Sequence, residues 1–318
     1  MPTKKHAYLI IAHNEFNMLK LLIRSLDDER NDIYVMVDAK SEDFNQKEFE
    51  GIAKYSDLIF TKRIKNYWAA FTHIEAHILL MEEALKNKYE YYHIISGVDI
   101  PLKTQNEIHS FFENSQSKEF VSMNEKSMNE LYEQERMKKI TKRDKIRYLL
   151  EINQFKFAFY YYFNQKCLNG SNYCKFAYRL ARIVFVFQQL LGIQRNKKIK
   201  IYKGSDWFSI THNLLIKILN KEEWVKKHFN YCFCPSELYV QTITKNFGFE
   251  NNIYEGGNMR YIDWKRGCPY TFLSQDYDEL INSGKLFSRK FSTAIDKEII
   301  RKLYCRLLPE DVVNAELQ

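Results

Sequence analysis

The sequence predicts an α/β fold in which helices cross over between the strands of a largely parallel sheet. Two observations support this prediction. The N-terminal third alternates short apolar runs with amphipathic stretches, and 45% of the 318 residues are hydrophobic, with only 10 glycines and 5 prolines. A chain of this length and composition can bury a sizeable core. We therefore expect residues 1–318 to form one large domain, with an insertion at 138–200.

The strands and helices of the first third follow in order along the chain. We expect strands at 8–12, 33–37, 58–60 and 91–96, and helices at 15–26 and 72–85. Asn14 can cap the first of these helices. Farther along, a Gly-Ser turn leads into an aromatic strand at 202–210, and a helix is expected at 213–219. Glu237 is expected at the start of another helix.

Polar side chains follow the expected strands at the points where the strands end. These residues are His13, Asn14, Asp38, Lys40 and Asp99. In open α/β sheets, ligands bind at the carboxyl ends of the strands, so these side chains are candidates for a shared binding site. Two of them also have a structural interpretation: Asn14 as a helix cap, and Asp38 as the start of a turn before Ser41.

The charge of the chain favours an acidic partner. The 48 Lys and Arg residues exceed the 40 Asp and Glu residues, which gives a net charge of +8. This suits a nucleotide, a phosphate or an anionic membrane surface. Basic and aromatic residues are concentrated at 138–200, where an amphipathic, cationic helix is expected at 175–192. That helix either faces the core or holds the protein against an anionic bilayer that carries a lipid-linked substrate. No nucleic-acid fold signature accompanies these residues, so we expect no nucleic-acid partner.

Two patterns that could suggest a metal site have simpler interpretations. Cys232 and Cys234 form a C-x-C pair, but no further ligand follows at zinc spacing, so buried structural thiols are expected. Asp276 and Asp278 spell D-x-D, but they lie where the first turn of a helix is expected, and acids there are favoured by the helix dipole. We therefore expect no metal site.

The start of the chain and its cysteines predict a cytoplasmic protein. The first strand begins almost at once, with no charged-then-apolar signal segment before it, and the six cysteines form no evident disulfide framework. No apolar run approaches the roughly twenty residues of a membrane-spanning helix. We expect a cytoplasmic location, with peripheral contact at the inner face of the membrane.

Eight segments, taken together, carry a resemblance to a known family. They are AYLIIAHNE at 7–15, IYVMVDAKS at 33–41, YWAAFTHIEA at 67–76, HIISGVDIPLKT at 93–104, KGSDWFSIT at 203–211, CPSELYVQTI at 234–243, MRYIDWKRG at 259–267 and LFSRKF at 286–291. In this order they resemble the core 2/I-branching N-acetylglucosaminyltransferase and protein xylosyltransferase family, family 14 of the glycosyltransferases. The resemblance covers nearly the whole chain, and the order of the segments makes it specific.

The resemblance implies a GT-A type nucleotide-sugar-binding domain, with a mixed central sheet flanked by helices and a helical insertion. It also implies an inverting mechanism without a metal cofactor. Most GT-A enzymes hold a metal with a D-x-D motif, but Val98-Asp99-Ile100 at the comparable place is a poor metal cage. Cations would then stabilise the departing diphosphate. The resemblance implies Arg266 and Lys290 for this role, with Lys265 as the reserve and Arg260 and Arg289 nearby.

The resemblance also implies roles for other site residues. An inverting transfer needs one general base, and Glu237 matches the glutamate of the Pro-x-Glu motif of the family. The remaining implied contacts are His13, Asn14, Asp38 and Lys40 to the nucleoside, and Asp99, Asp206, Trp207 and Trp68 to the sugars. Without the resemblance, Glu237 could be an ordinary acid at a helix start, and both tryptophans could simply fill the core.

The function expected from these observations is transfer of N-acetylglucosamine from UDP-N-acetylglucosamine to a sugar hydroxyl of a glycan acceptor, with β linkage. Animal members of the family are anchored and rich in disulfides, so a bacterial-type enzyme of surface polysaccharide synthesis fits this chain better. UDP-xylose or another UDP-sugar is the alternative donor. A non-catalytic carbohydrate- or nucleotide-binding protein is the alternative from another class, and a nucleic-acid-binding module is the third.

Overall fold

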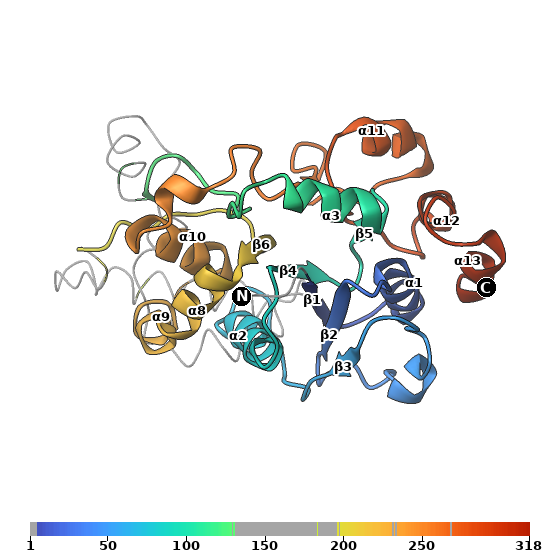
Figure 1. The fold of residues 1–318 in the computed structure, drawn as a ribbon, viewed down its shortest axis with the longest axis horizontal. Helices are drawn as coiled ribbons and strands as arrows, with labels where there is room; N and C mark the ends of the chain where they lie inside the picture. Colours follow the sequence, from blue (N-terminus) through green and yellow to red (C-terminus); the bar gives the residue numbers. More distant parts are fainter. Residues whose placement is uncertain are drawn as a thin grey trace.

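The computed structural model shows a mixed α/β fold (Figure 1). It describes residues 5–128, 130, 183, 196, 198–230, 232, 234–267 and 269–318. Most of the expected insertion at 138–200, including nearly all of its helix at 175–192, lies outside the described residues.

The central sheet has five strands in the order β3-β2-β1-β4-β6. They are β1 (His6–Ala12), β2 (Asn31–Val37), β3 (Leu58–Phe60), β4 (Tyr91–Ser96) and β6 (Phe208–Thr211). The first four run parallel, whereas β6 is antiparallel to β4. Because Phe208 lies opposite Ile94, the chain enters β6 at the edge where β1, β2 and β4 end. This reversal brings the loop before Phe208 to the expected ligand edge.

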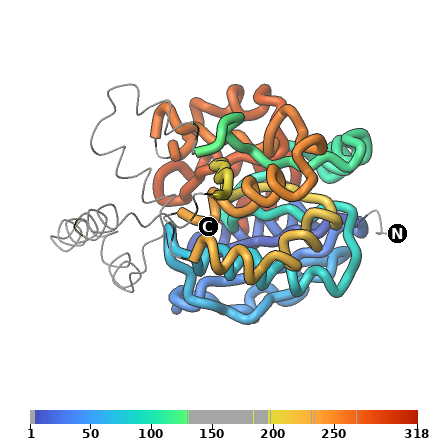
Figure 2. Tube along the Cα trace, turned by 90° about the vertical axis from the view of Figure 1, so that its left-hand side faces the viewer, coloured from blue at the N-terminus to red at the C-terminus, as the bar shows by residue number. Residues whose placement is uncertain are grey.

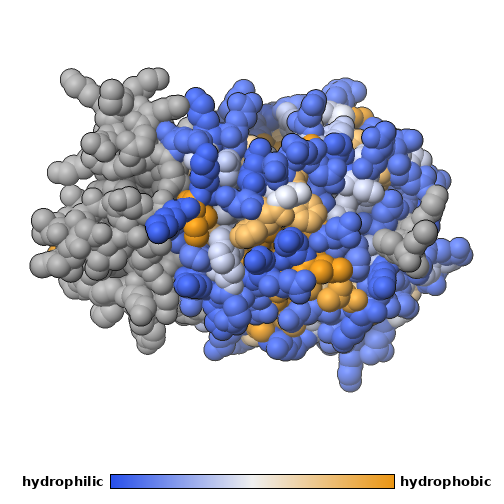
Figure 3. Space-filling model, turned by 60° about the vertical axis from the view of Figure 1, so that its left-hand side comes forward, coloured by the Kyte–Doolittle hydropathy of each residue, from blue (hydrophilic) through white to orange (hydrophobic). Residues whose placement is uncertain are grey.

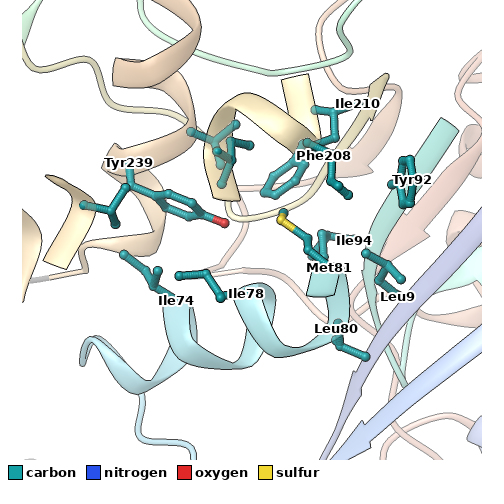
Figure 4. Packing of buried hydrophobic residues seen from close by; sticks show 14 of the residues in the cluster. Leu9, Ile74, Ile78, Leu80, Met81, Tyr92, Ile94, Phe208, Ile210 and Tyr239 are labelled. Atoms are coloured by element: carbon teal, nitrogen blue, oxygen red, sulfur yellow. The ribbon is translucent and has the colours of Figure 1, made fainter. Parts of the chain in front are cut away.

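Helices cover both faces of this sheet. They include α1 (Phe16–Leu26), α2 (Thr72–Leu85), α3 (Gln105–Glu113), α8 (His212–Leu219), α9 (Glu222–Phe229) and α10 (Ser236–Asn246). Every residue of β1 is buried, and its side chains alternate between two core clusters, as expected for a strand covered on both faces. Ala7, Leu9 and Ile11 pack with residues of α2, α8 and α10, whereas Tyr8 and Ile10 pack with residues of α1 and α3. Figure 4 shows Ile78 and Met81 of α2 within the first of these clusters.

A second, three-stranded sheet has the order β5-β8-β7. Its strands are β5 (Ile100–Pro101), β7 (Arg260–Ile262) and β8 (Phe287–Arg289), and the helices α11 (Tyr277–Asn282), α12 (Lys297–Tyr304) and α13 (Glu310–Glu316) accompany it. Figure 1 shows α12 and α13 beside α1, and Figure 2 shows these C-terminal segments stacked against the N-terminal part of the chain. Since Ile100 pairs with Ser288, the end of β8 lies beside the loop that follows β4.

Short 3-10 helices complete the described elements, at Gln46–Phe49, Glu250–Asn252 and Ser274–Asp276. In the described part of the chain, none of the helices combines the length and the apolar character that crossing a bilayer requires. On the face drawn in Figure 3, the described residues form a largely hydrophilic surface with small apolar patches.

Most expected elements are confirmed, and one detail is wrong. The strands at 58–60 and 91–96 and the helix at 72–85 have the expected bounds. However, Asn14 does not cap α1. The cap position is Glu15, which adopts a left-handed conformation with φ 54° and makes no side-chain cap hydrogen bond. Its carboxylate accepts hydrogen bonds from Ser292 and Thr293 instead. The loop after β1 is therefore tied to the segment that follows β8.

Candidate active site

Polar loops gather at the carboxyl edge of the central sheet. The loop after β4 can pass close to β1 because residue 97 is glycine: a Cβ atom there would lie 2.9 Å from the Ala12 Cβ atom. The same loop ends at Asp99, which is fully buried. The sheet edge is thus closely packed beneath the site, and Asp99 lies within this packed layer.

Asp99 is paired with an arginine of the second sheet. One Asp99 oxygen, Oδ2, accepts a hydrogen bond from the Ser96 amide at 3.1 Å. The other, Oδ1, forms an ion pair with Arg289 Nε at 3.5 Å. Burial raises the pKa of Asp99, and the nearby Arg289 charge opposes that shift. The Asp99 carboxylate is therefore held inside the packed layer, with Arg289 as its cationic partner.

Arg289 also stacks on Trp207, which precedes β6. The guanidinium carbon lies 4.2 Å from the Trp207 ring centroid, a cation–π contact. On another side, Trp207 meets the ring of His73 edge-on, with centroids 6.0 Å apart. Burial and the Arg289 charge lower the pKa of His73 to about 4, so this histidine is neutral at neutral pH. Asp99 and Trp207, both expected as sugar contacts, therefore meet through Arg289.

Glu237, the expected base, lies in the first turn of α10, as its sequence position predicts. Its Oε2 atom is 3.2 Å from the Lys203 ammonium, and the two side chains are 24% and 22% exposed. The exposed fraction leaves the carboxylate within reach of a substrate. The ion pair favours its charged form. This is the protonation state that a general base needs.

Asp206 lies beside this pair, on the loop that enters β6. Its Oδ1 atom has no hydrogen-bond partner among the described residues. Burial raises the pKa of Asp206, whereas a hydrogen bond with Ser236 and the charges of Arg289 and Lys203 act in the opposite direction. The structure thus brings Asp206 and Glu237 to one cation, Lys203.

Asp38, an expected nucleoside contact, organises its own turn. Its Oδ1 atom accepts hydrogen bonds from the amides of Lys40 at 2.9 Å and Asn66 at 3.3 Å. Its backbone oxygen accepts from the Ser41 amide at 3.0 Å. The Lys40 ammonium lies 3.4 Å from Asp38 Oδ2 and 4.4 Å from the Tyr67 ring centroid. The turn expected before Ser41 is confirmed, and it holds Lys40 over an aromatic ring.

His13 and Asn14 are exposed at the end of β1. Surrounding atoms desolvate the His13 ring and lower its pKa; Asp38 opposes this shift, and Lys290, Lys40 and Arg289 add to it. His13 therefore lies in a region of positive charge.

The two cations expected at the diphosphate have different surroundings. Arg266 forms ion pairs with Asp263, with Asp276 at 2.7 Å and with Glu279 at 2.8 Å. Its guanidinium carbon also lies 4.4 Å from the Tyr270 ring centroid. Lys265 and Lys290 are exposed, and no carboxylate of the described residues forms an ion pair with either of them.

Trp68 is 62% exposed, so it does not fill the core. The neighbouring Ala69 accepts a hydrogen bond from the Cys234 amide at 3.1 Å, which places this loop beside the start of α10 and hence near Glu237. Cys232 and Cys234 are buried, as expected for structural thiols. Within the described ranges, no group of three or more His, Cys, Asp or Glu side chains is arranged to hold a metal ion.

Two site residues received no role from the sequence. Arg289 immediately precedes Lys290 in LFSRKF, and Lys203 begins KGSDWFSIT, so both lie within segments that carry the resemblance. Their positions in those segments were the available signal. Their partners, Asp99 and Glu237, are far away in the sequence and could not be identified from spacing.

Comparison with known proteins identifies the family of this chain. A model of the core-2/I-branching enzyme family matches residues 6–282. The chain is 20% identical over 329 aligned positions to xylosyltransferase 2 of Canis lupus familiaris and of Homo sapiens, covering 95% of this chain and 33% of each relative. It is 27% identical over 106 positions to a probable beta-1,3-galactosyl-O-glycosyl-glycoprotein beta-1,6-N-acetylglucosaminyltransferase 7 of Sus scrofa, covering 32% of this chain and 25% of that protein. The chain thus spans about a third of the length of these xylosyltransferases.

Proposed function

The chain belongs to the core-2/I-branching enzyme family, and from this premise we propose that it transfers N-acetylglucosamine from UDP-N-acetylglucosamine to a sugar hydroxyl of a glycan acceptor. The observation that carries this proposal is the position of Glu237. It is a partly exposed carboxylate, paired with Lys203, next to a sheet edge that gathers Arg289, Lys290 and Trp207.

The proposed reaction is inverting and produces a β linkage. Glu237 accepts the proton of the acceptor hydroxyl while that oxygen attacks the anomeric carbon of the donor. The bond from the anomeric carbon to the diphosphate breaks on the opposite face, and UDP leaves with the electron pair. One carboxylate is enough for this chemistry, because no covalent sugar–enzyme intermediate forms.

We assign the stabilisation of the leaving diphosphate to fixed cations, so that no metal is required. Lys290 is the strongest candidate because it is exposed and forms no ion pair with a carboxylate of the described residues. Lys40 lies in the same positive region, as the common effect of both lysines on His13 indicates. Lys265, which is also exposed, is the second candidate, and Arg266 is the third because three carboxylates already pair with it. Preorganised cations of this kind stabilise charge that develops in the transition state.

The nucleoside and the sugars are assigned to the same edge. We place the nucleoside at His13, Asn14, Asp38 and Lys40, where the loops that follow the paired strands β1 and β2 lie side by side. Trp207 with Arg289, positioned by Asp99, would receive the donor sugar. Asp206 and the exposed Trp68 lie near Glu237 and would face the acceptor.

UDP-xylose is the second candidate donor. The observation that favours it is the similarity, across 95% of this chain, to proteins named xylosyltransferase 2. Xylose lacks the C6 group and the acetamido group of N-acetylglucosamine, so the space beside Trp207 would select between the donors.

The biological role that we propose is synthesis of a surface polysaccharide at the cytoplasmic side of a membrane. The net charge of +8 supports peripheral contact with an anionic bilayer that carries a lipid-linked acceptor. The six cysteines without an evident disulfide framework are consistent with a cytoplasmic enzyme.

The test is donor-dependent release of UDP in the presence of a chelator. We would compare UDP-N-acetylglucosamine, UDP-xylose, UDP-glucose and UDP-galactose for the wild type, Glu237→Gln and the control Glu223→Gln, which alters an exposed first-turn acid of α9. We expect release from UDP-N-acetylglucosamine, a loss of two to four orders of magnitude in Glu237→Gln, and no loss in the control.

Three outcomes would contradict parts of the proposal. Unchanged turnover in Glu237→Gln would remove this residue from the mechanism. A strict requirement for manganese would overturn the role of the fixed cations. If calorimetry detected no binding of UDP and no donor were turned over, the transferase function itself would have to be abandoned.

A further inference from the structure

Among the described residues, Lys203 is the cation that forms an ion pair with the proposed base. Its ammonium lies 3.2 Å from Glu237 Oε2, and about three quarters of each side chain is shielded from solvent. Shielding weakens the screening of this pair by water and salt. Water and salt therefore screen this contact less than they screen a fully exposed ion pair.

The backbone holds Lys203 at this position from two sides. On one side, the Asn124 amide donates to the Lys203 carbonyl at 2.8 Å. On the other side, the next amide, that of Gly204, donates to the Glu237 carbonyl at 2.9 Å. The fit is tight, because a Cβ atom at residue 204 would lie 1.7 Å from the Ser122 carbonyl oxygen. The loop therefore cannot shift along α10 without losing these contacts.

Two further hydrogen bonds fix the same loop to α10. The Tyr202 amide donates to Thr242 Oγ1 at 3.1 Å, and the buried Gln241 side chain donates to the Ser205 carbonyl at 2.7 Å. Lys203 thus extends from a loop that is bound to the helix carrying Glu237. These hydrogen bonds therefore fix the position of Lys203 relative to Glu237.

Several charged or titratable groups lie around Asp206, which precedes β6 on the same loop as Lys203. Lys203 and Arg289 act on Asp206, and Asp206 acts on Tyr239 of α10. Arg289 also acts on His73 of α2, and His73 acts on His77. Burial lowers the pKa of both histidines and raises that of Tyr239, so these three are neutral near pH 7. Arg289 is already paired with Asp99. Among the described residues, Lys203 forms an ion pair with Glu237 and its charge also acts on Asp206.

We infer that Lys203 is a positioning residue that keeps the Glu237 carboxylate ionised and oriented, and that it thereby sets the lower pH limit of sugar transfer. Without the ammonium, two neighbouring carboxylates would repel each other, and protonation would relieve that repulsion. A protonated Glu237 could not accept the proton of the acceptor. The inference rests on the proposed role of Glu237 as the base.

The test compares pH profiles of kcat/KM for the wild type, Lys203→Met, Lys203→Arg and the control Lys200→Met. The control removes a lysine of the same segment that pairs with Glu130 instead. In Lys203→Met, we expect the acidic limb to move to higher pH by about one unit, which is a tenfold loss of kcat/KM on that limb. Lys203→Arg and the control should keep the wild-type limb. The affinity for UDP, measured by calorimetry, should be the same in all four proteins.

An acidic limb that stays at the wild-type pH in folded Lys203→Met would overturn the inference, and so would a change confined to KM for the acceptor. If Lys203→Met does not fold, Lys203→Gln replaces it and is subject to the same criterion. The Glu237→Gln variant separates this failure from that of the proposed function. An inactive Glu237→Gln combined with an unshifted limb in Lys203→Met would reject only the role of Lys203.

Discussion

Arg266 and Lys290 are both cations expected at one diphosphate, yet their surroundings are opposite. Arg266 is held by three carboxylates and stacks on Tyr270. Lys290 follows β8, is exposed, and pairs with no carboxylate of the described residues. An anionic ligand would have to compete with three acids for Arg266, but it could approach Lys290 directly. The comparison teaches that nearby carboxylates, more than residue type, decide whether a cation is available to a ligand.

The largest effect that would sharpen this comparison is expected from Lys290→Met. Loss of a preorganised charge at the leaving group should lower kcat/KM by about two to three orders of magnitude. The melting temperature should not change, because the Lys290 side chain is exposed. Steady-state kinetics and calorimetry with UDP would measure both effects. Wild-type kinetics in this variant would remove Lys290 from the site.

Arg266→Met should produce the opposite result. Removing the guanidinium leaves three carboxylates close together, one of which, Asp276, is buried. We expect the melting temperature to fall by several degrees, because like charges repel and a buried acid loses its partner. The kcat/KM value of the folded variant should stay within a few-fold of the wild type. A loss of UDP affinity comparable to that of Lys290→Met would break the comparison and place Arg266 at the diphosphate.

The sequence predicts the features that depend on residues close together in the chain. The strands at 58–60 and 91–96 and the helix at 72–85 were predicted with their observed bounds, because apolar runs and helical periodicity are local properties. The family resemblance implies a mixed central sheet, but not the order of its strands. Thus most of the fold could be inferred before any contact was known.

The contacts within the candidate site could not be inferred in this way. Arg289 reaches Asp99 because β5 and β8 pair, and their register is a property of the folded chain. Lys203 reaches Glu237 because a loop binds α10 through backbone hydrogen bonds. The sequence predicts that Glu15 begins a helix, but Glu15 adopts a left-handed conformation and its carboxylate accepts hydrogen bonds from Ser292 and Thr293. In each case the partner comes from a distant segment.

The smallest effect concerns the acids around Arg266. It tests whether the more buried acid contributes more to the stability of the fold. Asp276 is 5% exposed and also accepts a hydrogen bond from the Leu273 amide at 2.8 Å, whereas Glu279 is 39% exposed. Glu279→Gln should therefore lower the melting temperature by about one degree or less, since exposed ion pairs contribute little. Asp276→Asn should lower it further, because a buried pair is lost. Salt should reduce the smaller effect, since exposed charges are screened more than buried ones. Equal losses in the two variants, measured by thermal unfolding at low and high salt, would mean that Arg266 is held equally by both acids and that burial does not distinguish them.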